Sequence, residues 1–417
     1  MNILLKSAKI VDSSSDFNLA TKDILIENGI ISKIEDYIDA SNNVKEINLE
    51  NLHISKGWFD SSVCFGEPGL EDRETLANGL TVAAKSGFTT VAINANTYPI
   101  IDNNSGVSFI KNKAFGNAVN ALPIGALTVR SEGVDLAEMY DMQNAGAVAF
   151  YDYQHAISNP NLVKIALQYA QNFDALICCF PQESKIAGKG VVNEHLSGTQ
   201  LGLKGIPSLA ESLNVARDLF ILEYTGGKLH IPTISTAKSV ALIKEAKEKG
   251  LDVTCSVAIH NLIYTDAVLE RFDTRYKVLP PLRTADENIA LIEGLQDGTI
   301  DFVTTDHNPI DIEHKKVEFD HAMYGTIGLE AAFGALQTLF STEKTVELLT
   351  KGLHRFKQNE TAIQIGSEAN LTLFNPEKTY TFTKSHILSA SKNSIYLNTE
   401  LKGEAYGIIN NHQIILK

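Results

Sequence analysis

A carboxylate and an imidazole side by side at the end of an apolar run are the first candidates for chemistry in this chain. Asp306 and His307 stand in the sequence TTDHNP, residues 304–309, which closes the apolar run 300–305. An aspartate in such a place can act as a general base on a metal-bound water. The competing interpretation is a carboxylate that is only hydrogen-bonded at a strand end. The sequence favours the second interpretation, because no metal site accompanies Asp306.

Cysteine offers a second kind of chemistry, either as a metal ligand or as a nucleophile. The four cysteines, Cys64, Cys178, Cys179 and Cys255, all fall on predicted strands. Their spacing has no ligand signature such as Cys-x-x-Cys, and cysteine is commonly buried as a small apolar residue. We therefore expect all four to be core residues, without a disulfide framework.

Eight short apolar runs alternate with amphipathic stretches through the middle of the chain and must position these side chains. The helical stretches include Glu74–Lys85, closed by Gly87, and Thr236–Lys249, closed by Gly250. Continuous apolar runs are typical of buried parallel strands, and eight such units in about 300 residues predict a (β/α)8 barrel. A doubly wound sheet is the alternative. The predicted strands are 58–65, 90–94, 124–129, 147–151, 175–180, 229–234, 253–259 and 300–305.

Both ends of the chain have the patterns of β-structure. Residues 1–12 alternate as a strand, Asn28-Gly29 joins two alternating runs as a hairpin, and a second hairpin is centred on Asn410 and Asn411. The sequence ANLTLFNPEKTY predicts a strand followed by a turn. We expect residues 1–55 and 360–417 to form one small β-sandwich domain beside a barrel of residues 56–359.

The active site of such a barrel lies at the carboxyl ends of its strands. The segments found there include FDSSVCFGEPG (59–69), NANTYP (94–99), FYDYQ (150–154) and HIPTIST (230–236), and the most specific is the long stretch from LPPLR to TTDHNP at 279–309. In this order they resemble the corresponding segments of the dihydroorotase family. The resemblance runs over almost the whole chain, to the type of dihydroorotase with a composite β-domain. It implies metal-assisted opening and closing of a cyclic amide, with zinc bound by histidines and a carboxylate.

The chain departs from that pattern at almost every metal ligand. By the resemblance, Ser62-Val63-Cys64 stands where the family has a His-x-His motif at the end of strand one. Gly66 stands where the family has an arginine that binds the substrate carboxylate. The bridging carboxylate of strand four falls at Tyr153, next to Asp152. Phe180 and Thr233 stand where the family has the histidines of strands five and six. The Asp-His-x-Pro-His motif after the last strand keeps Asp306 and His307 but ends in Ile310. Tyr324-Gly325 stands where the family has a Pro-Gly pair near the substrate. The retained residues are Asp60, Asn96, Arg283 and Asp306.

Serine, threonine and phenylalanine cannot replace imidazole as zinc ligands, and Cys64 with Asp306 would supply only two ligands. We therefore expect no metal site and no cofactor, with Asp306 as a vestigial catalytic residue and Asn96 as a vestigial substrate-binding residue. Zinc would be required if the chain were an active enzyme after all.

Other histidines receive structural interpretations. His230 precedes a missing ligand on its strand, so we expect it to point into the barrel wall or the helix layer. His260 stands in a segment that resembles a family motif with two adjacent histidines, of which the second is Asn261 here, and we expect it to have a structural role. His314 and His321 are expected on a surface loop.

Three functions remain open at this point. The resemblance implies a non-catalytic structural partner of aspartate transcarbamoylase in pyrimidine biosynthesis, since inactive dihydroorotase-like chains hold that enzyme together in some bacteria. The alternative is an active dihydroorotase or related cyclic amidohydrolase, such as an allantoinase or hydantoinase, with an atypical metal site. The third is a sensor that binds an uncharged small molecule at the carboxyl end of the barrel, the barrel mouth, where the altered residues are expected.

The formal net charge of −14 disfavours nucleic acid and anionic lipid as partners. The amino terminus lacks the features of a signal peptide, and no apolar run is long enough to span a membrane, so a cytoplasmic protein is expected. We also expect a homo-oligomer.

Overall fold

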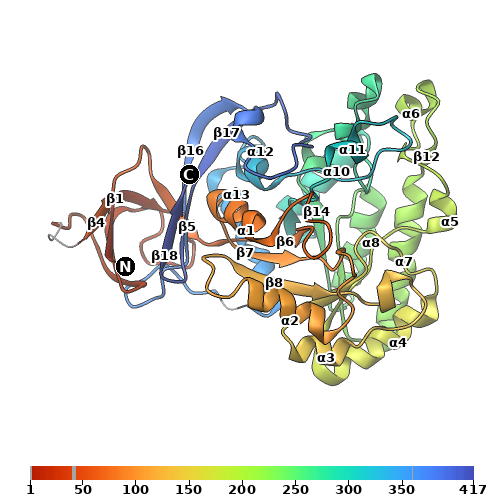
Figure 1. Ribbon diagram of the computed structural model, residues 1–417, viewed down its shortest axis with the longest axis horizontal. Coiled ribbons are helices and arrows are strands. Elements are labelled where there is room, and N and C mark those ends of the chain that lie inside the picture. Colours follow the sequence, from red (N-terminus) through yellow and green to blue (C-terminus); the bar gives the residue numbers. More distant parts are fainter. Residues whose placement is uncertain (1, 40–43, 359) are drawn as a thin grey trace.

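The computed structural model describes residues 2–39, 44–358 and 360–417, and the middle of the chain forms a parallel barrel (Figure 1). Eight strands pair in the order β15-β14-β13-β10-β9-β8-β7-β6, and a parallel bridge between Val63 and His307 brings the first and last strands together. The predicted (β/α)8 barrel is therefore confirmed, and the doubly wound alternative is wrong. The strands are β6 (Trp58–Val63), β7 (Phe88–Ile93), β8 (Asn120–Gly125), β9 (Ala149–Tyr151), β10 (Leu176–Cys178), β13 (Lys228–Ile231), β14 (Val253–Ala258) and β15 (Phe302–Thr304).

Helices surround the barrel. The two that the sequence predicted begin after the side-chain caps Thr75 and Thr236, whose hydroxyls accept backbone N–H groups of the first turn. The longer helices are α1 (Leu76–Lys85), α2 (Asn104–Lys113), α4 (Pro160–Ala170), α7 (Ser208–Thr225), α8 (Ala237–Glu248), α10 (Ala285–Gln296) and α13 (Thr342–Thr350). Shorter ones are α3 (Met139–Asn144), α5 (Ser184–Ala187), α6 (Leu196–Gln200), α9 (His260–Ile263), α11 (Ile312–Lys315) and α12 (Ala332–Leu336).

The two ends of the chain pair into a separate sheet beside the barrel (Figure 1). Its strand order is β18-β17-β16-β5-β1-β2-β3, with β4 paired to β1. The predicted hairpins are confirmed, because Asn28, Gly29, Asn411 and His412 all have the positive φ that tight turns require. The strands are β1 (Asn2–Ile10), β2 (Thr21–Glu27), β3 (Ile30–Glu35), β4 (Lys45–Ile47), β5 (His53–Lys56), β16 (Leu371–Thr381), β17 (Glu400–Asn410) and β18 (Gln413–Leu416). Met1 of the predicted first strand lies outside the described residues.

Most predicted strands differ from the observed ones by one to three residues at an end, and two elements, β8 and β16, differ more. Strand β8 begins four residues before the predicted run 124–129, because its first half carries Asn120 and Pro123 and lacks a continuous apolar signal. Strand β16 continues through the predicted turn at residues 375–378. The Asn375 side chain accepts the backbone N–H of Glu377 at 3.0 Å, and the register shifts there, so the turn residues form a bulge inside the strand.

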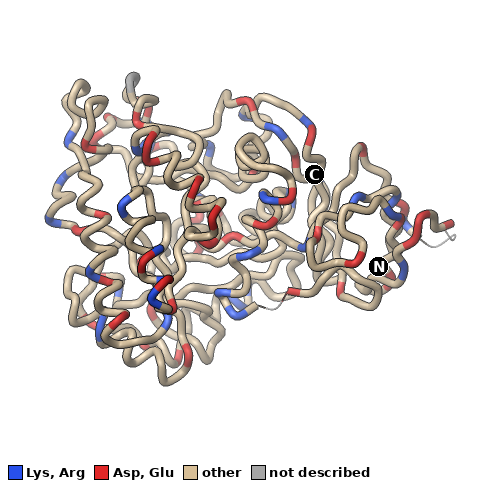
Figure 2. The backbone as a smooth tube through the Cα atoms, turned by 180° about the vertical axis from the view of Figure 1, so that it is seen from behind, with Lys and Arg blue, Asp and Glu red and all other residues tan. Residues whose placement is uncertain are grey.

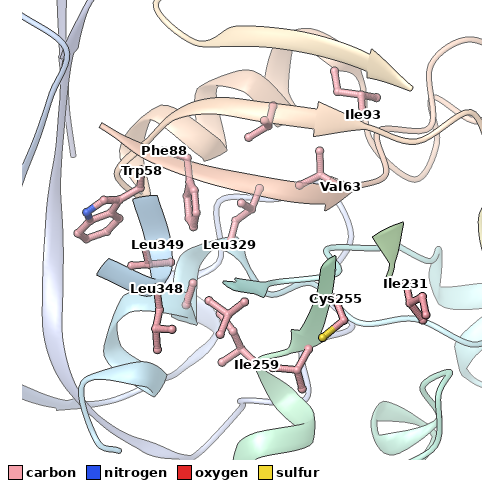
Figure 3. Packing of buried hydrophobic residues seen from close by; sticks show 14 of the residues in the cluster. Trp58, Val63, Phe88, Ile93, Ile231, Cys255, Ile259, Leu329, Leu348 and Leu349 are labelled. Carbon is pink, nitrogen blue, oxygen red and sulfur yellow. The ribbon is translucent and has the colours of Figure 1, made fainter. Parts of the chain in front are cut away.

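The buried side chains form two layers, because neighbouring residues of a strand face opposite sides. One layer lies between the strands and the outer elements, and it includes Trp58, Phe88 and Cys255 (Figure 3). The other fills the barrel lumen. On β15, for example, Phe302 belongs to the lumen layer and Val303 to the outer layer.

Charged residues of both signs are interspersed over the barrel and the terminal sheet (Figure 2). Within the described parts of the chain, no helix is long and apolar enough to cross a bilayer.

Candidate functional site

Asp306 stands at the carboxyl end of β15, fully within the barrel mouth. Its backbone has a φ of 45°, which bends the chain out of the strand immediately after Thr305. Its carboxylate accepts a hydrogen bond from the Ser62 hydroxyl at 2.9 Å and one from the Gln154 amide at 3.4 Å. The prediction of a carboxylate hydrogen-bonded at a strand end therefore matches its geometry.

The surroundings of Asp306 disfavour its charged form. Burial raises the pKa of this carboxyl from 3.8 to about 7, the hydrogen bond from Ser62 opposes that rise, and the nearby Asp60 adds to it. A group with that pKa is poised between its two protonation states near neutral pH. Within the mouth, it is the side chain best suited to accept or donate a proton.

Asp60 binds the barrel together where its first and last strands meet. Its two carboxylate oxygens accept hydrogen bonds from the Thr304 and Thr305 hydroxyls, from the Thr305 backbone N–H at 3.1 Å and from the Ser62 N–H at 3.1 Å. Every acceptor direction of the carboxylate is thus used within the protein. We assign this residue, which the family resemblance retains, to closing the barrel.

Cys64, at the place where the family resemblance puts the second histidine of the His-x-His motif, is a buried thiol. The Asn94 amide contacts its Sγ at 3.6 Å and also donates to the Ser62 hydroxyl at 2.9 Å. Burial, reinforced by the charge of Asp306, raises the Cys64 pKa to about 12, and the nearby Asn96 side chain opposes that rise. Cys64 is therefore a protonated thiol. The predicted substrate-binding residue Asn96 lies beside it, half-buried at the mouth.

The end of β9 places Tyr153 in the mouth and turns Asp152 away from it. Asp152 accepts backbone N–H groups of Leu127 and Thr128 at 2.9 and 3.0 Å, together with the Thr128 hydroxyl. It therefore holds the loop after β8 and faces away from Asp306. Tyr153 is buried, its hydroxyl has no hydrogen-bond partner among the described residues, and burial raises its pKa well above 10.

The far side of the mouth is apolar. Cys64, Tyr153 and Phe180 belong to the same continuous cluster that fills the lumen, together with Leu279 and the half-buried Tyr324. This cluster extends without a break to Phe302 and Phe356 at the opposite end of the barrel. Three of the five positions that would carry metal ligands are thus parts of a hydrophobic core.

Tyr324 ties the chain after β15 across to the segment before β11 (Val192–Asn193). Its hydroxyl donates to the Gly190 carbonyl at 3.1 Å, and the Lys277 ammonium lies 5.0 Å from its ring centre. Lys277 is itself buried and donates to the Phe319 carbonyl at 2.7 Å. These contacts hold the loops over the apolar side of the mouth.

The remaining altered positions are fixed by backbone packing. A Cβ atom on Gly66 would lie 2.0 Å from the Leu70 carbonyl oxygen, so no side chain fits where the family resemblance expects an arginine. Thr233 is buried with a φ of 50°, and its N–H lies 3.4 Å from the Ser256 hydroxyl. Ile310 is buried and its N–H contacts Asn393 at 3.2 Å.

Arg283 lies apart from Asp306. Its guanidinium is fully buried and donates to the Ser235 hydroxyl, the Asn193 side chain and the Ile206 carbonyl at 3.1, 2.9 and 2.7 Å. The neighbouring Glu211 accepts the N–H groups of Ser235 and Thr236. This retained arginine therefore joins the loops of β12 (Gly205–Ile206) and β13.

The expectation for His230 was wrong. The ring lies inside the lumen, stacked on Phe302 at 5.2 Å and hydrogen-bonded to Thr254 and Ser256 at 3.0 and 3.2 Å. The outward-facing neighbours on β13 are the apolar Leu229 and Ile231, which leave position 230 for the lumen. Burial lowers the His230 pKa to about 3, so the ring is neutral.

The other candidate histidines do not gather around Asp306. His307 is buried, and its Nδ1 accepts the N–H groups of Gly328 and Leu329 at 3.2 and 3.4 Å. His260 is buried and its pKa is lowered to about 3. His314 and His321 are exposed, as predicted; His321 lies in a loop, whereas His314 lies in the short helix α11 and pairs with Asp311 at 2.7 Å.

All four cysteines are buried free thiols, as the core interpretation predicted, and burial raises each of their pKa values. Sequence reasoning did not identify Gln154 and Asn94 as parts of the Asp306 network. The available signal was their position, each at the carboxyl end of a predicted strand.

The mouth does not fit zinc. Within residues 2–39, 44–358 and 360–417, no three His, Cys, Asp or Glu side chains converge as a metal site would require. The nearest donors are the Asp306 carboxyl, the Cys64 thiol and the Ser62 hydroxyl. Zinc sites in proteins use imidazole, thiolate and carboxylate ligands, so this set offers only two suitable groups, fewer than the three or four that a zinc site uses.

The barrel, the sheet of terminal strands and the position of Asp306 define a protein of the amidohydrolase class. Among solved structures, an L-hydantoinase (dihydropyrimidinase) from Arthrobacter aurescens superposes with a TM-score of 0.86 at 22% identity, covering 100% of this chain and 96% of the other. A D-hydantoinase from Thermus sp. gives 0.82 at 19% identity, covering 100% and 95%. At these identities the likeness concerns the fold.

The sequence relatives are more specific. The family model described as dihydro-orotase-like matches residues 53–239. Proteins named dihydroorotase from Trichlorobacter lovleyi and Geobacter metallireducens are each 36% identical, over 97% and 100% of both chains. One from Caldanaerobacter subterraneus is 37% identical over 97% of this chain and 94% of its own. The chain belongs to the dihydroorotase family.

Proposed function

We propose that this protein is a non-catalytic member of the dihydroorotase family that serves as a structural partner of aspartate transcarbamoylase. The observation that carries the first half of the proposal is the apolar cluster in the mouth. Phe180, Tyr153 and Cys64 stand where the family resemblance puts ligands, and they pack into the core of the barrel.

Two of the residues that the family resemblance retains support the same conclusion. Asp60 and Arg283 use their polar atoms to join strands and loops, as do Asp152 and Glu211. All four thus have a role in the shape of the barrel that needs no catalysis. Asp306 by itself has no metal-bound water to activate, and a base without an activated nucleophile contributes little to hydrolysis of a cyclic amide.

The partner rests on the family resemblance. By the resemblance, dihydroorotases of this type often associate with aspartate transcarbamoylase, and a chain that keeps its shape without the metal ligands fits a role in assembly. The test is size-exclusion chromatography of the purified chain mixed with the transcarbamoylase of the same organism. Co-elution in a complex of fixed stoichiometry is expected, and separate elution at micromolar concentrations of both proteins would overturn this role.

The catalytic half of the proposal has its own experiment. The purified protein is incubated with Zn²⁺ and assayed for dihydroorotase activity in both directions beside an Asp306→Ala control. We expect equal, background rates for the two proteins and substoichiometric zinc by elemental analysis. Activity that disappears with Asp306→Ala would overturn the proposal.

The second candidate is an active dihydroorotase with an atypical site. The names of the relatives favour it, since proteins 36–37% identical over nearly their full length are called dihydroorotase. Asp306 also stands at the end of β15 with a pKa of about 7, which suits a proton shuttle. The side-chain chemistry around it favours the first candidate, and the zinc and activity measurements separate the two.

A further inference from the structure

A cavity of about 500 Å³ lies at the amino-terminal end of the barrel strands, opposite the mouth that holds Asp306. One wall is formed by Val11 and Asp12, in the turn after β1, and by Lys56 at the end of β5. The other wall is formed by the first residues of β14 and β15 and by one face of α13. The cavity therefore lies between the terminal sheet and the barrel. Its size is that of a small-molecule site, and junctions of this kind are where such sites are common.

The inner surface of this cavity is apolar and its outer part is acidic. Glu343, Val346 and Glu347 follow one another on α13 at intervals of three and one residues, which places them on one side of the helix. Val346 is buried together with Val11 and Phe302, and the two glutamates are exposed. A ligand here would contact hydrocarbon on one side and carboxylates on the other.

The lysine and arginine side chains of the cavity already have carboxylate partners. Lys56 lies 2.6 Å from Glu360, and Arg355 is paired with Asp252. Lys351 lies 3.8 Å from a glutamate of α13. These cations are therefore not the groups that a ligand would meet without competition.

Two carboxylates of the cavity keep acceptor atoms that the protein does not use. Asp301 accepts hydrogen bonds from the Lys247 ammonium at 2.7 Å and from the Cys255 N–H at 2.8 Å, both at Oδ2. Its Oδ1, and both oxygens of Glu343, have no hydrogen-bond or ion-pair partner among the described residues. Since Asp301 precedes β15 and Glu343 begins α13, the two unused acceptors stand on different elements. The complementary ligand donates at two separate places.

A second hollow extends the cavity past Glu343. It has a volume of about 260 Å³ and shares Val11 and Glu343 with the first, so the two adjoin along the junction. His53 also lines it, and burial lowers the pKa of this ring, which makes the neutral form the favoured one. Glu343 thus stands between two hollows, and the combined space is elongated.

We propose that this junction binds a linear polyamine. One ammonium group pairs with Glu343, another pairs with Asp301, and the methylene segment between them packs on Val11, Phe302 and Val346. The chain's net charge of −14 attracts polycations, and the apolar surface between the two carboxylates selects one with a hydrocarbon segment. A bare metal ion does not suit the site, because no three His, Cys, Asp or Glu side chains of the described residues converge. The proposal holds whether or not the barrel mouth is catalytic.

The first experiment is isothermal titration calorimetry of the full-length chain with spermidine at low ionic strength, where charge pairs are least screened. Hexaamminecobalt(III) is the matched control ligand, because it carries the same charge as spermidine without a methylene chain. We expect one spermidine per chain, bound at least about tenfold more tightly than the cobalt complex, since only spermidine buries hydrocarbon. An absence of binding, or equal affinities for the two cations, overturns the proposal.

Variants of the chain locate the site. Glu343→Gln should weaken spermidine binding by about threefold, and Glu293→Gln, at an exposed carboxylate of α10 outside the cavity, should leave it unchanged. Equal weakening by both would show diffuse attraction to an acidic chain and overturn the site.

A bulky residue tests the cavity without removing a carboxylate. Ser13 is exposed and lines the cavity, so the indole of Ser13→Trp should fill it and abolish binding. Spermidine should accordingly raise the melting temperature of the wild type and leave that of Ser13→Trp unchanged, while the two proteins without ligand melt at similar temperatures. An equal rise in both proteins contradicts the assignment to this cavity.

Discussion

The two halves of the barrel mouth differ in what they keep. The half formed by β6 and β15 is a polar network in which Asp60, Ser62 and Asp306 are joined by hydrogen bonds. The half formed by β9 and β10 is apolar, with Tyr153 and Phe180 packed into the lumen. The polar half joins the first strand to the last, whereas the other half is held mainly by apolar packing, with Gln154 after β9 donating to Asp306 at 3.4 Å and to the Leu279 carbonyl at 2.8 Å. The two halves are therefore stabilised differently, by a hydrogen-bond network on one side and by burial of apolar surface on the other.

Removing the ring of Phe180 should cause the largest effect. Phe180→Ala opens a cavity in the lumen cluster and is expected to lower the free energy of unfolding by about 3–5 kcal/mol. Urea unfolding followed by circular dichroism measures it. Phe115→Ala, at an exposed ring, is the matched control and should change stability by less than about 0.5 kcal/mol. Equal, small effects would mean that the apolar half is not core.

On the polar side, Asp60→Ala should cost roughly 1–3 kcal/mol, because the Thr304 and Thr305 hydroxyls and the Thr305 N–H lose their acceptor inside the protein. Asp60→Asn, which keeps an oxygen acceptor, should cost less. The same urea titration gives both values. A neutral Asp60→Ala variant would remove the role in barrel closure given to this residue.

Asp306→Asn should have the opposite sign. A carboxyl whose folded pKa is about 7, against 3.8 for the free group, binds more protons in the folded state between these values, so its contribution to stability falls as pH rises from about 4 to 7. Substitution by the uncharged amide should therefore stabilise the protein at pH 8 by roughly 1–2 kcal/mol, within an upper limit of about 4 kcal/mol, and much less at pH 4. Melting temperatures of both proteins across this range measure the difference. A wild type that gains stability relative to Asp306→Asn with rising pH contradicts the prediction.

The smallest effect is expected at Ser62. Ser62→Ala removes the hydroxyl that donates to Asp306 and accepts from Asn94, and should cost about 1 kcal/mol at pH 8. In the Asp306→Asn background the cost should change, because the two side chains share a bond. A double-mutant cycle measures this coupling. Strict additivity would show that the polar half is a set of separate contacts.

Much of the fold was predictable because it follows from local patterns. The eight apolar runs, the caps at Thr75 and Thr236 and the turn at Asn28-Gly29 each depend on a few consecutive residues. The bulge in β16 was not predictable, because Asn375 and Pro376 have the same turn preference whether the chain reverses or continues. Pairing with β17 and β5 decides that case.

The candidate site was predictable only as a list of residue types. The order of the motifs along the sequence placed Ser62, Phe180 and Asp306 at strand ends, and the family resemblance predicted that metal ligands are missing there. It could not show that His230 turns into the lumen, because both faces of β13 are buried and alternation alone does not tell which is which.

The sequence by itself thus determined the barrel, the terminal sheet, the family and the residue types at the strand ends. Tertiary structure alone decided how those side chains lie: a carboxyl with a raised pKa beside Ser62 on one side, and aromatic rings continuous with the core on the other. It also decided that one face of α13 lines a cavity between the barrel and the terminal sheet, which the helical period permits but does not require. The physical reason is common to these cases, since burial and the pKa values that follow from it depend on residues far apart in the chain, which only the closed barrel brings together.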